Sequence, residues 1–127
     1  MKLSITGSRS ITDKDWVFAQ IDNFIQEIYR KKKTKVPITI LSGGAKGIDT
    51  IAKEYADTNN MDFVLFKPYH MIDSKVKFET KYFFARNRQL ADNADVCLVL
   101  WNNVSHGTKH FIDYCERKGK PIGVIKR

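Results

Sequence analysis

Short apolar segments alternate with amphipathic helical segments along the whole chain, and this alternation constrains the fold more than any other feature of the sequence. Five segments have the length and apolar character of β-strands: residues 2–6, 36–41, 62–66, 95–101 and 121–125. The segments between them carry apolar residues at helical spacing, as Val17, Ile21 and Ile25 do in the first. Strands that alternate with helices pair in parallel through right-handed crossovers, so the pattern predicts an α/β protein.

We therefore expect one Rossmann-like three-layer sandwich, in which helices cover both faces of a five-stranded, mostly parallel sheet. A chain of 127 residues has room for one core, so we assign residues 1–127 to a single domain. The run 96–100 is continuously apolar, which predicts a central strand buried on both faces. Residues 12–15 resemble a capping box that starts at Thr12, and residues 67–77, with Pro68 as a breaker, are predicted to form a loop.

The charge balance points to an anionic partner. The 22 Lys and Arg residues outnumber the 14 Asp and Glu residues, and 22 − 14 gives a net charge of +8. No apolar run approaches the length of a membrane span, and the first residues do not resemble a signal peptide. Cys97, Cys115 and the three histidines show no metal-ligand spacing. We therefore expect a cytoplasmic protein with no metal, no cofactor and no membrane partner.

Ligands of open parallel sheets bind at the carboxyl ends of the strands, so the residues that directly follow each strand are the most informative about function. After the first strand, Gly7 lets the backbone approach a ligand, and Ser8 and Ser10 offer hydroxyls. Arg9 offers a planar guanidinium that can grip a phosphate or a carboxylate. The alternative interpretation is an ordinary tight turn with a solvated arginine.

A glycine-rich segment follows the second strand and opens a helix. Free backbone N–H groups and the positive end of the helix dipole form a cradle for an anion there. The spacing matches neither the P-loop nor the G-x-G-x-x-G pattern. We expect phosphate binding by this segment, whose candidate residues are Ser42, Gly43, Gly44, Ala45, Gly47 and Asp49. In the alternative interpretation, the glycines form a turn and Asp49 stabilises the first turn of the helix.

A polar loop follows the most apolar strand and opens the last helix. Ser105, Gly107 and Thr108 in this loop suit an anion or a ribose hydroxyl. The alternative is a polar loop in which a serine caps the helix.

Arg86, Asn87 and Arg88 lie inside the helix predicted for residues 78–93. Successive helical residues point about 100° apart, so one or two of the three can face a common ligand. The segment 75–88 has five basic residues and one acidic residue, and 5 − 1 gives a local charge of +4 among interleaved aromatic residues. That composition suits single-stranded nucleic acid or a nucleobase, and the candidate nucleic-acid contacts are Lys75, Lys77, Lys81 and Arg88. In the alternative interpretation, the aromatic residues belong to the core.

Taken together, these motifs resemble the SLOG superfamily, whose name joins Smf, the DNA-processing protein A, with LOG, the cytokinin-activating phosphoribohydrolases. The resemblance covers nearly the whole chain, and its most specific element is SGGAKGID at residues 42–49. The other matching motifs are Gly7-Ser8-Arg9, Arg86-Asn87-Arg88 and Ser105-His106-Gly107-Thr108. Within the superfamily the sequence is most similar to the stand-alone YspA-like group of bacteria and phages, which is thought to bind nucleotides or nucleotide-derived ligands.

The resemblance implies a Rossmann-like fold and one ligand site, in a setting of nucleotide signalling or phage–host conflict. By this resemblance, a first loop contacts phosphate or sugar, a glycine cradle holds phosphate, two helical residues approach the pocket and a third loop closes it. The implied residues are, in the same order, Gly7, Ser8 and Arg9, then Gly43, Gly44, Ala45 and Gly47, then Arg86 and Asn87, and finally Ser105, Gly107 and Thr108.

The sequence departs from the enzymes of the superfamily at one informative place. LOG enzymes carry P-G-G-x-G-T-x-x-E, whose Glu serves in glycosidic cleavage, and Phe111 stands at that position here. Asn102-Asn103-Val104 replaces the residues that precede the motif. We therefore favour a binding protein over an enzyme. If the chain is an enzyme, Asp49 is the candidate acid or base.

Three functions stay open at this point. The first is binding of a nucleotide or nucleotide-derived small molecule by the phosphate-suited loops. The second is binding of single-stranded DNA or RNA, as in relatives of DNA-processing protein A, whose extra domains do not fit in 127 residues. The third is a phosphoribohydrolase-like reaction. All three are compatible with a homo-oligomer.

Overall fold

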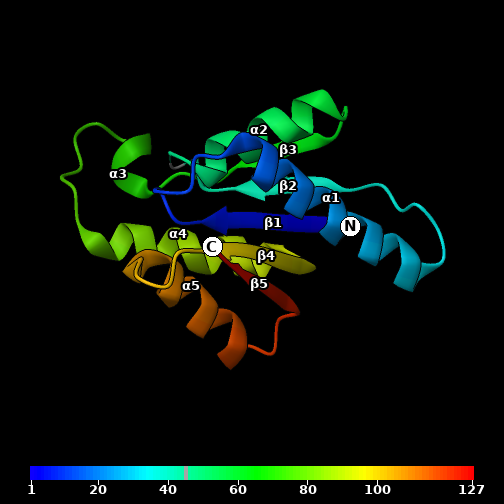
Figure 1. The fold of residues 1–127 in the computed structure, drawn as a ribbon. Coiled ribbons are helices and arrows are strands. Elements are labelled where there is room, and N and C mark those ends of the chain that lie inside the picture. The colour runs from blue at the N-terminus through cyan, green and yellow to red at the C-terminus, as the bar shows by residue number, and fades with distance from the viewer. Residues whose placement is uncertain (45) are drawn as a thin grey trace.

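The computed structural model describes residues 1–44 and 46–127, which form a five-stranded, fully parallel sheet (Figure 1). The strand order is β3-β2-β1-β4-β5. In chain order the strands are β1 (Lys2–Gly7), β2 (Thr39–Ser42), β3 (Asp62–Leu65), β4 (Val96–Trp101) and β5 (Ile122–Lys126). The predicted Rossmann-like sandwich with a parallel sheet is thereby confirmed.

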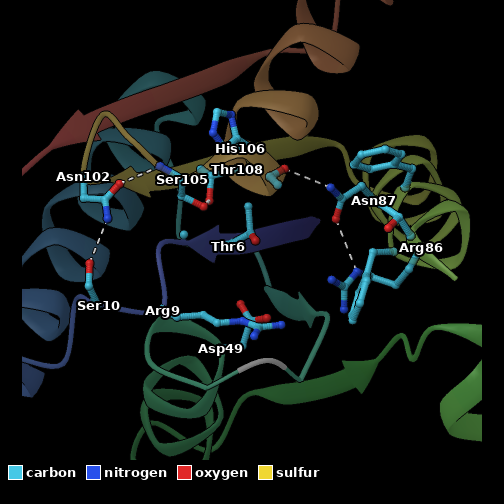
Figure 2. A pocket seen from close by; sticks show the side chains of 15 residues that line it. Thr6, Arg9, Ser10, Asp49, Arg86, Asn87, Asn102, Ser105, His106 and Thr108 are labelled. Atoms are coloured by element: carbon cyan, nitrogen blue, oxygen red, sulfur yellow. Dashed lines mark hydrogen bonds between the residues drawn. The ribbon is translucent and has the colours of Figure 1, made fainter. Parts of the chain in front are cut away.

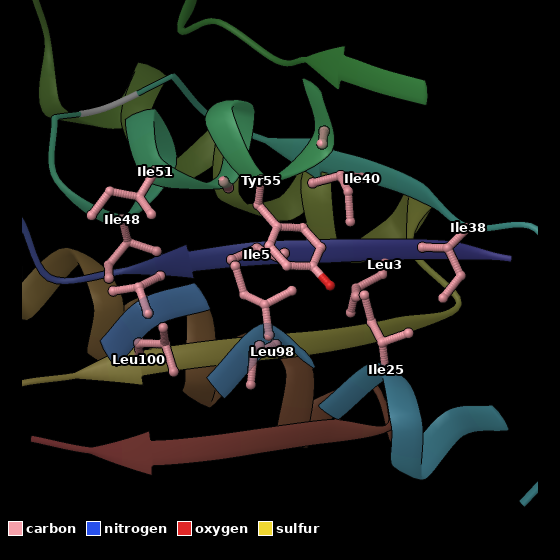
Figure 3. Packing of buried hydrophobic residues seen from close by; sticks show 14 of the residues in the cluster. Leu3, Ile5, Ile25, Ile38, Ile40, Ile48, Ile51, Tyr55, Leu98 and Leu100 are labelled. Carbon is pink, nitrogen blue, oxygen red and sulfur yellow. The ribbon is translucent and has the colours of Figure 1, made fainter. Parts of the chain in front are cut away.

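Helices cover both faces of the sheet. One face packs against α1 (Lys14–Lys32) and α2 (Ile48–Thr58), and the other packs against α4 (Thr80–Asn93) and α5 (His106–Arg117). Figure 3 shows the first of these layers, where Ile25 of α1 and Ile48 of α2 pack on apolar side chains of β1 and β4. Cys97 and Cys115 are both free and buried, in the layer between β4 and α5.

The chain changes sides between β3 and β4. After the edge strand β3, the chain passes β2 and β1 and adds β4 on the other side of β1. The helices before this crossing, α1 and α2, lie on one face of the sheet, and the helices α4 and α5 lie on the other. In folds of this kind the reversal of strand order opens a crevice at the carboxyl ends of the two strands beside it, which are here β1 and β4. The register pairs Gly7 with Leu100, so these two strands end side by side.

Several element boundaries differ from those predicted. The second strand begins at Thr39 rather than residue 36, because Pro37 has no N–H to donate to a ladder. The first helix is capped by Asp13 and not by Thr12; the Asp13 side chain accepts a hydrogen bond from the Trp16 amide. The predicted loop 67–77 contains one helical turn, α3 (Tyr69–Ile72), which follows Pro68.

The central position in the sheet belongs to β1 and not to the most apolar strand, β4. Residues 97–100 of β4 are nevertheless fully buried, as predicted, because β4 is an interior strand with a helical layer on each face. Within the described part of the chain, no helix is both long enough and apolar enough to span a bilayer.

Candidate functional site: a cleft between β1 and β4

A cleft of about 510 Å³ opens at the carboxyl ends of β1 and β4, where the strand order reverses (Figure 2). The β1–α1 loop, the β4–α5 loop, the start of α5, and one face of α4 form its walls. The lining residues are Thr6, Gly7, Arg9, Ser10, Asp49, Thr80, Phe83, Phe84, Arg86, Asn87, Asn102, Ser105, His106, Gly107 and Thr108. The reversal point thus brings together residues from distant parts of the sequence.

The two loops beside the cleft are joined by Ser8, Ser10 and Asn102. The Ser8 hydroxyl accepts a hydrogen bond from the Asn102 amide over 3.0 Å, and the Ser10 hydroxyl accepts one from Asn102 Nδ2 over 2.8 Å. Asn102 Oδ1 also accepts from the amides of Val104 and Ser105. Ser8 is fully buried and does not line the cleft. Its position indicates that Ser8 fixes the loops and that Ser10 and Asn102 are the polar groups a ligand would meet.

Gly7 belongs to the same junction for a steric reason. A Cβ at Gly7 would lie 2.3 Å from the carbonyl oxygen of Leu100, so only glycine permits this approach of β1 to β4. The Leu100 carbonyl instead accepts a hydrogen bond from the Ser8 amide. The first predicted loop therefore contributes Gly7 and Arg9 to the cleft wall, and Arg9 is its exposed cation.

Two arginines and one carboxylate form a charge cluster on the side of the cleft opposite α5. Asp49 is 4% exposed and Arg86 is 9% exposed, and Figure 2 shows Arg9 extending beside Asp49. Burial lowers the pKa of Arg86; the Asp49 carboxylate opposes this effect and the Arg9 guanidinium adds to it. The guanidinium carbons of Arg9 and Arg86 lie 6.0 Å and 5.6 Å from the ring centre of Phe83. The cluster thus places two guanidinium groups near one aromatic ring, with the Asp49 carboxylate beside Arg9.

Asn87 connects this cluster to the start of α5. Its Oδ1 accepts a hydrogen bond from Arg86 Nε over 3.3 Å, and its Nδ2 donates to the Gly107 carbonyl over 3.1 Å. The same Nδ2 lies 3.4 Å from Nδ1 of His110, whose ring stacks on Phe84 with 4.1 Å between ring centres. Burial and the positive charges of Arg88 and Arg117 lower the pKa of His110, although Asp113 opposes them. Asn87 therefore holds α4 and α5 in a fixed relation across the cleft.

The start of α5 lies at the cleft. Residues 105–108 line the cleft, and the first N–H groups of a helix have no carbonyl partner within that helix. The hydroxyls of Ser105 and Thr108 lie 3.1 Å apart and bond to each other. No heavy atom lies within 4 Å of the position of a Cβ at Gly107. Thr108 is 5% exposed, so the part of the third predicted loop that adjoins open space is the backbone at Gly107.

The glycine segment after β2 lacks the open space that is found at Gly107. A Cβ at Gly43 would lie 2.3 Å from Nη1 of Arg86, one at Gly44 2.6 Å from Leu65, and one at Gly47 2.8 Å from the Arg9 carbonyl. Gly43, Gly44 and Gly47 thus pack against protein atoms, and of the described residues 42–44 and 46–49 only Asp49 lines the cleft.

Ser42 and Ala45 were also predicted to take part in phosphate binding by the glycine segment. Ser42 is fully buried and its hydroxyl accepts from the Gly44 amide, so it stabilises the turn. Ala45 lies outside the described residues. Phosphate binding by the glycine segment stays a prediction.

The structure also separates the basic residues of segment 75–88. Arg86 and Asn87 line the cleft, whereas Lys75, Lys77, Lys81 and Arg88 are exposed and lie outside its described lining. Lys81 pairs with Glu79 over 3.0 Å. No group of three or more His, Cys, Asp or Glu residues in ranges 1–44 and 46–127 is arranged to hold a metal ion.

Sequence reasoning favoured the core for the aromatic residues of segment 75–88, but the structure places Phe83 and Phe84 in the cleft wall. Each precedes a selected residue by three positions, Arg86 and Asn87 respectively, and residues three apart share a helix face. That spacing was the available signal. The hydroxyl of Ser10 was expected in the site, and Ser10 lines the cleft. Thr6, Asn102 and His106 belong to the loops already singled out, but nothing in their residue types separated them from neighbours.

Comparisons with known proteins agree with this architecture. A family model described as YAcAr, the YspA, cpYpsA-related SLOG family, matches residues 1–70, which is more than half of the 127-residue chain. The match includes the β1–α1 loop and the glycine segment and ends before α4. None of the curated proteins matches the chain.

Two solved structures of DNA processing protein A have a similar fold. The Helicobacter pylori protein, described for its unique single-stranded DNA binding mode, has a TM-score of 0.72 at 20% identity; the match covers 100% of this chain and 66% of that one. The Streptococcus pneumoniae protein has a TM-score of 0.73 at 20% identity, over 99% of this chain and 50% of that one. The chain thus spans less than two thirds of either protein, and the likeness at this identity shows the fold.

Proposed function

We propose that this chain, which belongs to the YspA, cpYpsA-related SLOG family, binds a nucleotide or a nucleotide-derived small molecule in the cleft between β1 and β4. The volume of about 510 Å³ lies within the range of small-molecule sites, which is roughly 300–1,000 Å³. The cleft also combines the groups that such a ligand needs: donors for a phosphate, hydroxyl partners for a sugar and rings for a base.

The observation that carries the proposal is the open start of α5. A helix N-terminus attracts anions through its free N–H groups and its dipole, and Gly107 leaves room for a phosphate to reach the backbone. The hydroxyls of Ser105 and Thr108 also lie at the start of α5, on residues that line the cleft. Arg9 supplies an exposed cation from the opposite wall. We place the phosphate here rather than on the glycine segment, where protein atoms fill the space at each described glycine.

The remaining walls suit a sugar and a base. Asp49 is a buried carboxylate on the cleft wall, and a carboxylate accepts hydrogen bonds from ribose hydroxyls. Phe84 has one ring face against His110, and both Phe83 and Phe84 contribute to the cleft wall, where a base can pack on an aromatic surface.

We propose binding without catalysis. Phe111, at the position of the glutamate in the enzymes that the sequence resembles, is 1% exposed and packs in the core with Leu90 and Val99. It offers neither an acid nor a base to the cleft. Asp49 is the carboxylate among the described lining residues, and it interacts electrostatically with Arg86, so we assign it the role of a hydrogen-bond acceptor.

A second candidate function is the binding of single-stranded nucleic acid, and one set of contacts favours it. The ring of Phe83 on the cleft wall lies 5.5 Å from that of Phe78, which is 61% exposed, and 5.2 Å from that of His70. Aromatic surface therefore continues from the cleft to the outside, close to Lys75 and Lys77 in sequence. The fold is shared with a protein described as binding single-stranded DNA.

Calorimetric titration with adenosine, AMP and a short oligothymidylate distinguishes these functions. If the start of α5 binds phosphate, AMP binds more tightly than adenosine, and Gly107→Val weakens AMP binding by about tenfold or more while adenosine binding changes less. Equal affinities for AMP and adenosine, or AMP binding unchanged in a folded Gly107→Val variant, would contradict the proposed phosphate site. Binding of the oligonucleotide alone would support the second function.

A further inference from the structure

A second hollow, of about 590 Å³, lies at the amino ends of the strands, whereas the cleft lies at their carboxyl ends. The later turns of α1 form one side of it, and the beginnings of β1, β4 and β5 form the other. We call this hollow the α1 groove. Its apolar lining consists of Met1, Phe24, Ile28, Val96 and Pro121, and its charged rim consists of Glu27, Lys31, Lys32 and Asp95.

The apolar floor of the α1 groove is held in place by the fold. A Cβ at Gly123 of β5 would lie 2.5 Å from Cε1 of Phe24, so the ring packs directly on the β5 backbone. Phe24 and Val96 are both partly buried against the main core. The N-terminal amine of Met1 donates to the Pro37 carbonyl over 2.7 Å, which fixes the start of β1. The floor is therefore a preformed apolar surface, and a ligand does not have to order it.

The charges on the rim are unequally satisfied. Glu27 accepts two hydrogen bonds from Arg30, one of them over 3.0 Å, and Asp95 accepts one from the Lys2 amide over 2.7 Å. Lys31 and Lys32 are exposed, and no carboxylate in residues 1–44 and 46–127 lies within ion-pair distance of either ammonium group. Two further lysines, at positions 33 and 35, follow them. At this end of α1 the basic residues Arg30, Lys31, Lys32, Lys33 and Lys35 outnumber the two carboxylates of the rim, Glu27 and Asp95, so the side of the groove formed by α1 is basic.

We propose that the α1 groove binds a small amphiphilic anion, with an alkyl or aryl body on the floor and a carboxylate, sulfonate or phosphate end at Lys31 and Lys32. The volume of the groove lies in the range of small-molecule sites. The basic rim also opposes a second copy of this chain, because the net charge is +8 and like charges repel. This site is separate from the cleft, and its ligand does not depend on the function proposed there.

Titration of the isotopically labelled protein with octanoate, followed by amide chemical shifts, tests the proposal. We expect saturable shifts at Phe24, Ile28 and Val96 with octanoate, much weaker shifts with octanol, and none with octylammonium. The double substitution Lys31→Gln with Lys32→Gln lowers octanoate affinity by about tenfold, because two ion pairs are lost.

Lys75→Gln with Lys77→Gln is the matched control, because it removes the same charge from exposed residues far from the groove, and it leaves octanoate affinity unchanged. A second variant, Ile28→Glu, places a carboxylate on the floor and abolishes the shifts. Equal responses to octanoate and octylammonium, shifts confined to the cleft, or an equal loss of affinity in the control would overturn the proposal.

Discussion

Arg86 donates a hydrogen bond from Nη1 to the carbonyl oxygen of Gly43 over 2.8 Å, across 43 positions of sequence. This contact joins α4 to the end of β2, and it places a guanidinium in the space that a side chain at position 43 would occupy. Glycine at this position therefore serves the packing of a buried cation. The glycine segment shapes the cleft through Arg86 and Asp49 more than through its own described backbone.

Gly43→Ala is expected to destabilise the protein by about 2–3 kcal/mol, because the new methyl group displaces the Arg86 guanidinium and leaves a buried charged donor without its acceptor. Urea unfolding followed by circular dichroism measures the change. Gly107→Ala is the matched control: it adds the same methyl group where no heavy atom lies within 4 Å. In a helix this change is neutral or stabilises by about 0.5–1 kcal/mol. Similar losses in both variants would contradict this role of Gly43.

Arg9→Lys is expected to weaken AMP binding by about tenfold while the free energy of unfolding stays the same. Lysine keeps the charge but loses the planar fork that binds phosphate oxygens in pairs, and Arg9 is exposed, so the fold does not depend on it. Calorimetry gives the affinity. Arg88→Lys is a suitable control, because Arg88 is exposed outside the cleft lining and its replacement should leave AMP binding unchanged. AMP binding by Arg9→Lys at the level of the unaltered protein would make Arg9 a solvated turn residue.

The sequence was sufficient to predict the fold because the relevant signals are local. The period of Val17, Ile21 and Ile25 identified α1, and the continuous apolar run of β4 identified an interior strand. Strand boundaries were less accessible from the sequence, since pairing depends on a neighbouring strand. Residues 36–38 are apolar apart from Pro37 yet stay outside β2, because the ladder with β1 begins at Thr39.

The candidate site was only partly predictable, since side chains of similar composition have different surroundings. Ser8 and Ser10 are equally polar and two positions apart, but Ser8 is buried beneath the Asn102 amide and Ser10 faces the cleft. The sequence predicts both Gly43 and Gly107 in polar segments that follow strands, but Arg86 covers the first and open space adjoins the second, which lies in the first turn of α5. Such differences arise from packing between elements that are distant in sequence.

Acidification is expected to destabilise the protein through His110. Burial and nearby arginines lower its pKa below the ordinary value of 6.5, so the unfolded chain binds a proton more readily than the folded one. Stability is therefore highest above pH 6.5 and falls as the pH drops from that value toward the pKa of the folded state. Protonated Nδ1 would also face the donor Nδ2 of Asn87 at 3.4 Å. Urea unfolding between about pH 7 and pH 5 measures the slope.

His110→Gln should reduce the pH dependence of unfolding, because glutamine does not titrate in this range. His106→Gln is the control; His106 is exposed at the start of α5, and its replacement should leave the slope intact. A slope that survives His110→Gln unchanged would assign the pH dependence to other groups.

The last prediction concerns single-stranded nucleic acid and tests whether the lysines near α3 extend the cleft. Lys75 and Lys77 are exposed in the segment between α3 and α4, and Phe78 beside them carries aromatic surface toward Phe83 on the cleft wall. If an oligothymidylate follows this path, its affinity falls with salt at a slope of ~0.7 per neutralised phosphate. Lys75→Gln with Lys77→Gln should then lower the slope by about 1.4, with AMP binding unchanged.

The control is Lys31→Gln with Lys32→Gln, which makes the same change in net charge at the α1 groove, at the amino ends of the strands, and should leave the slope as it was. An equal decrease in both double variants would show that the oligonucleotide responds to total charge rather than to a path beside the cleft.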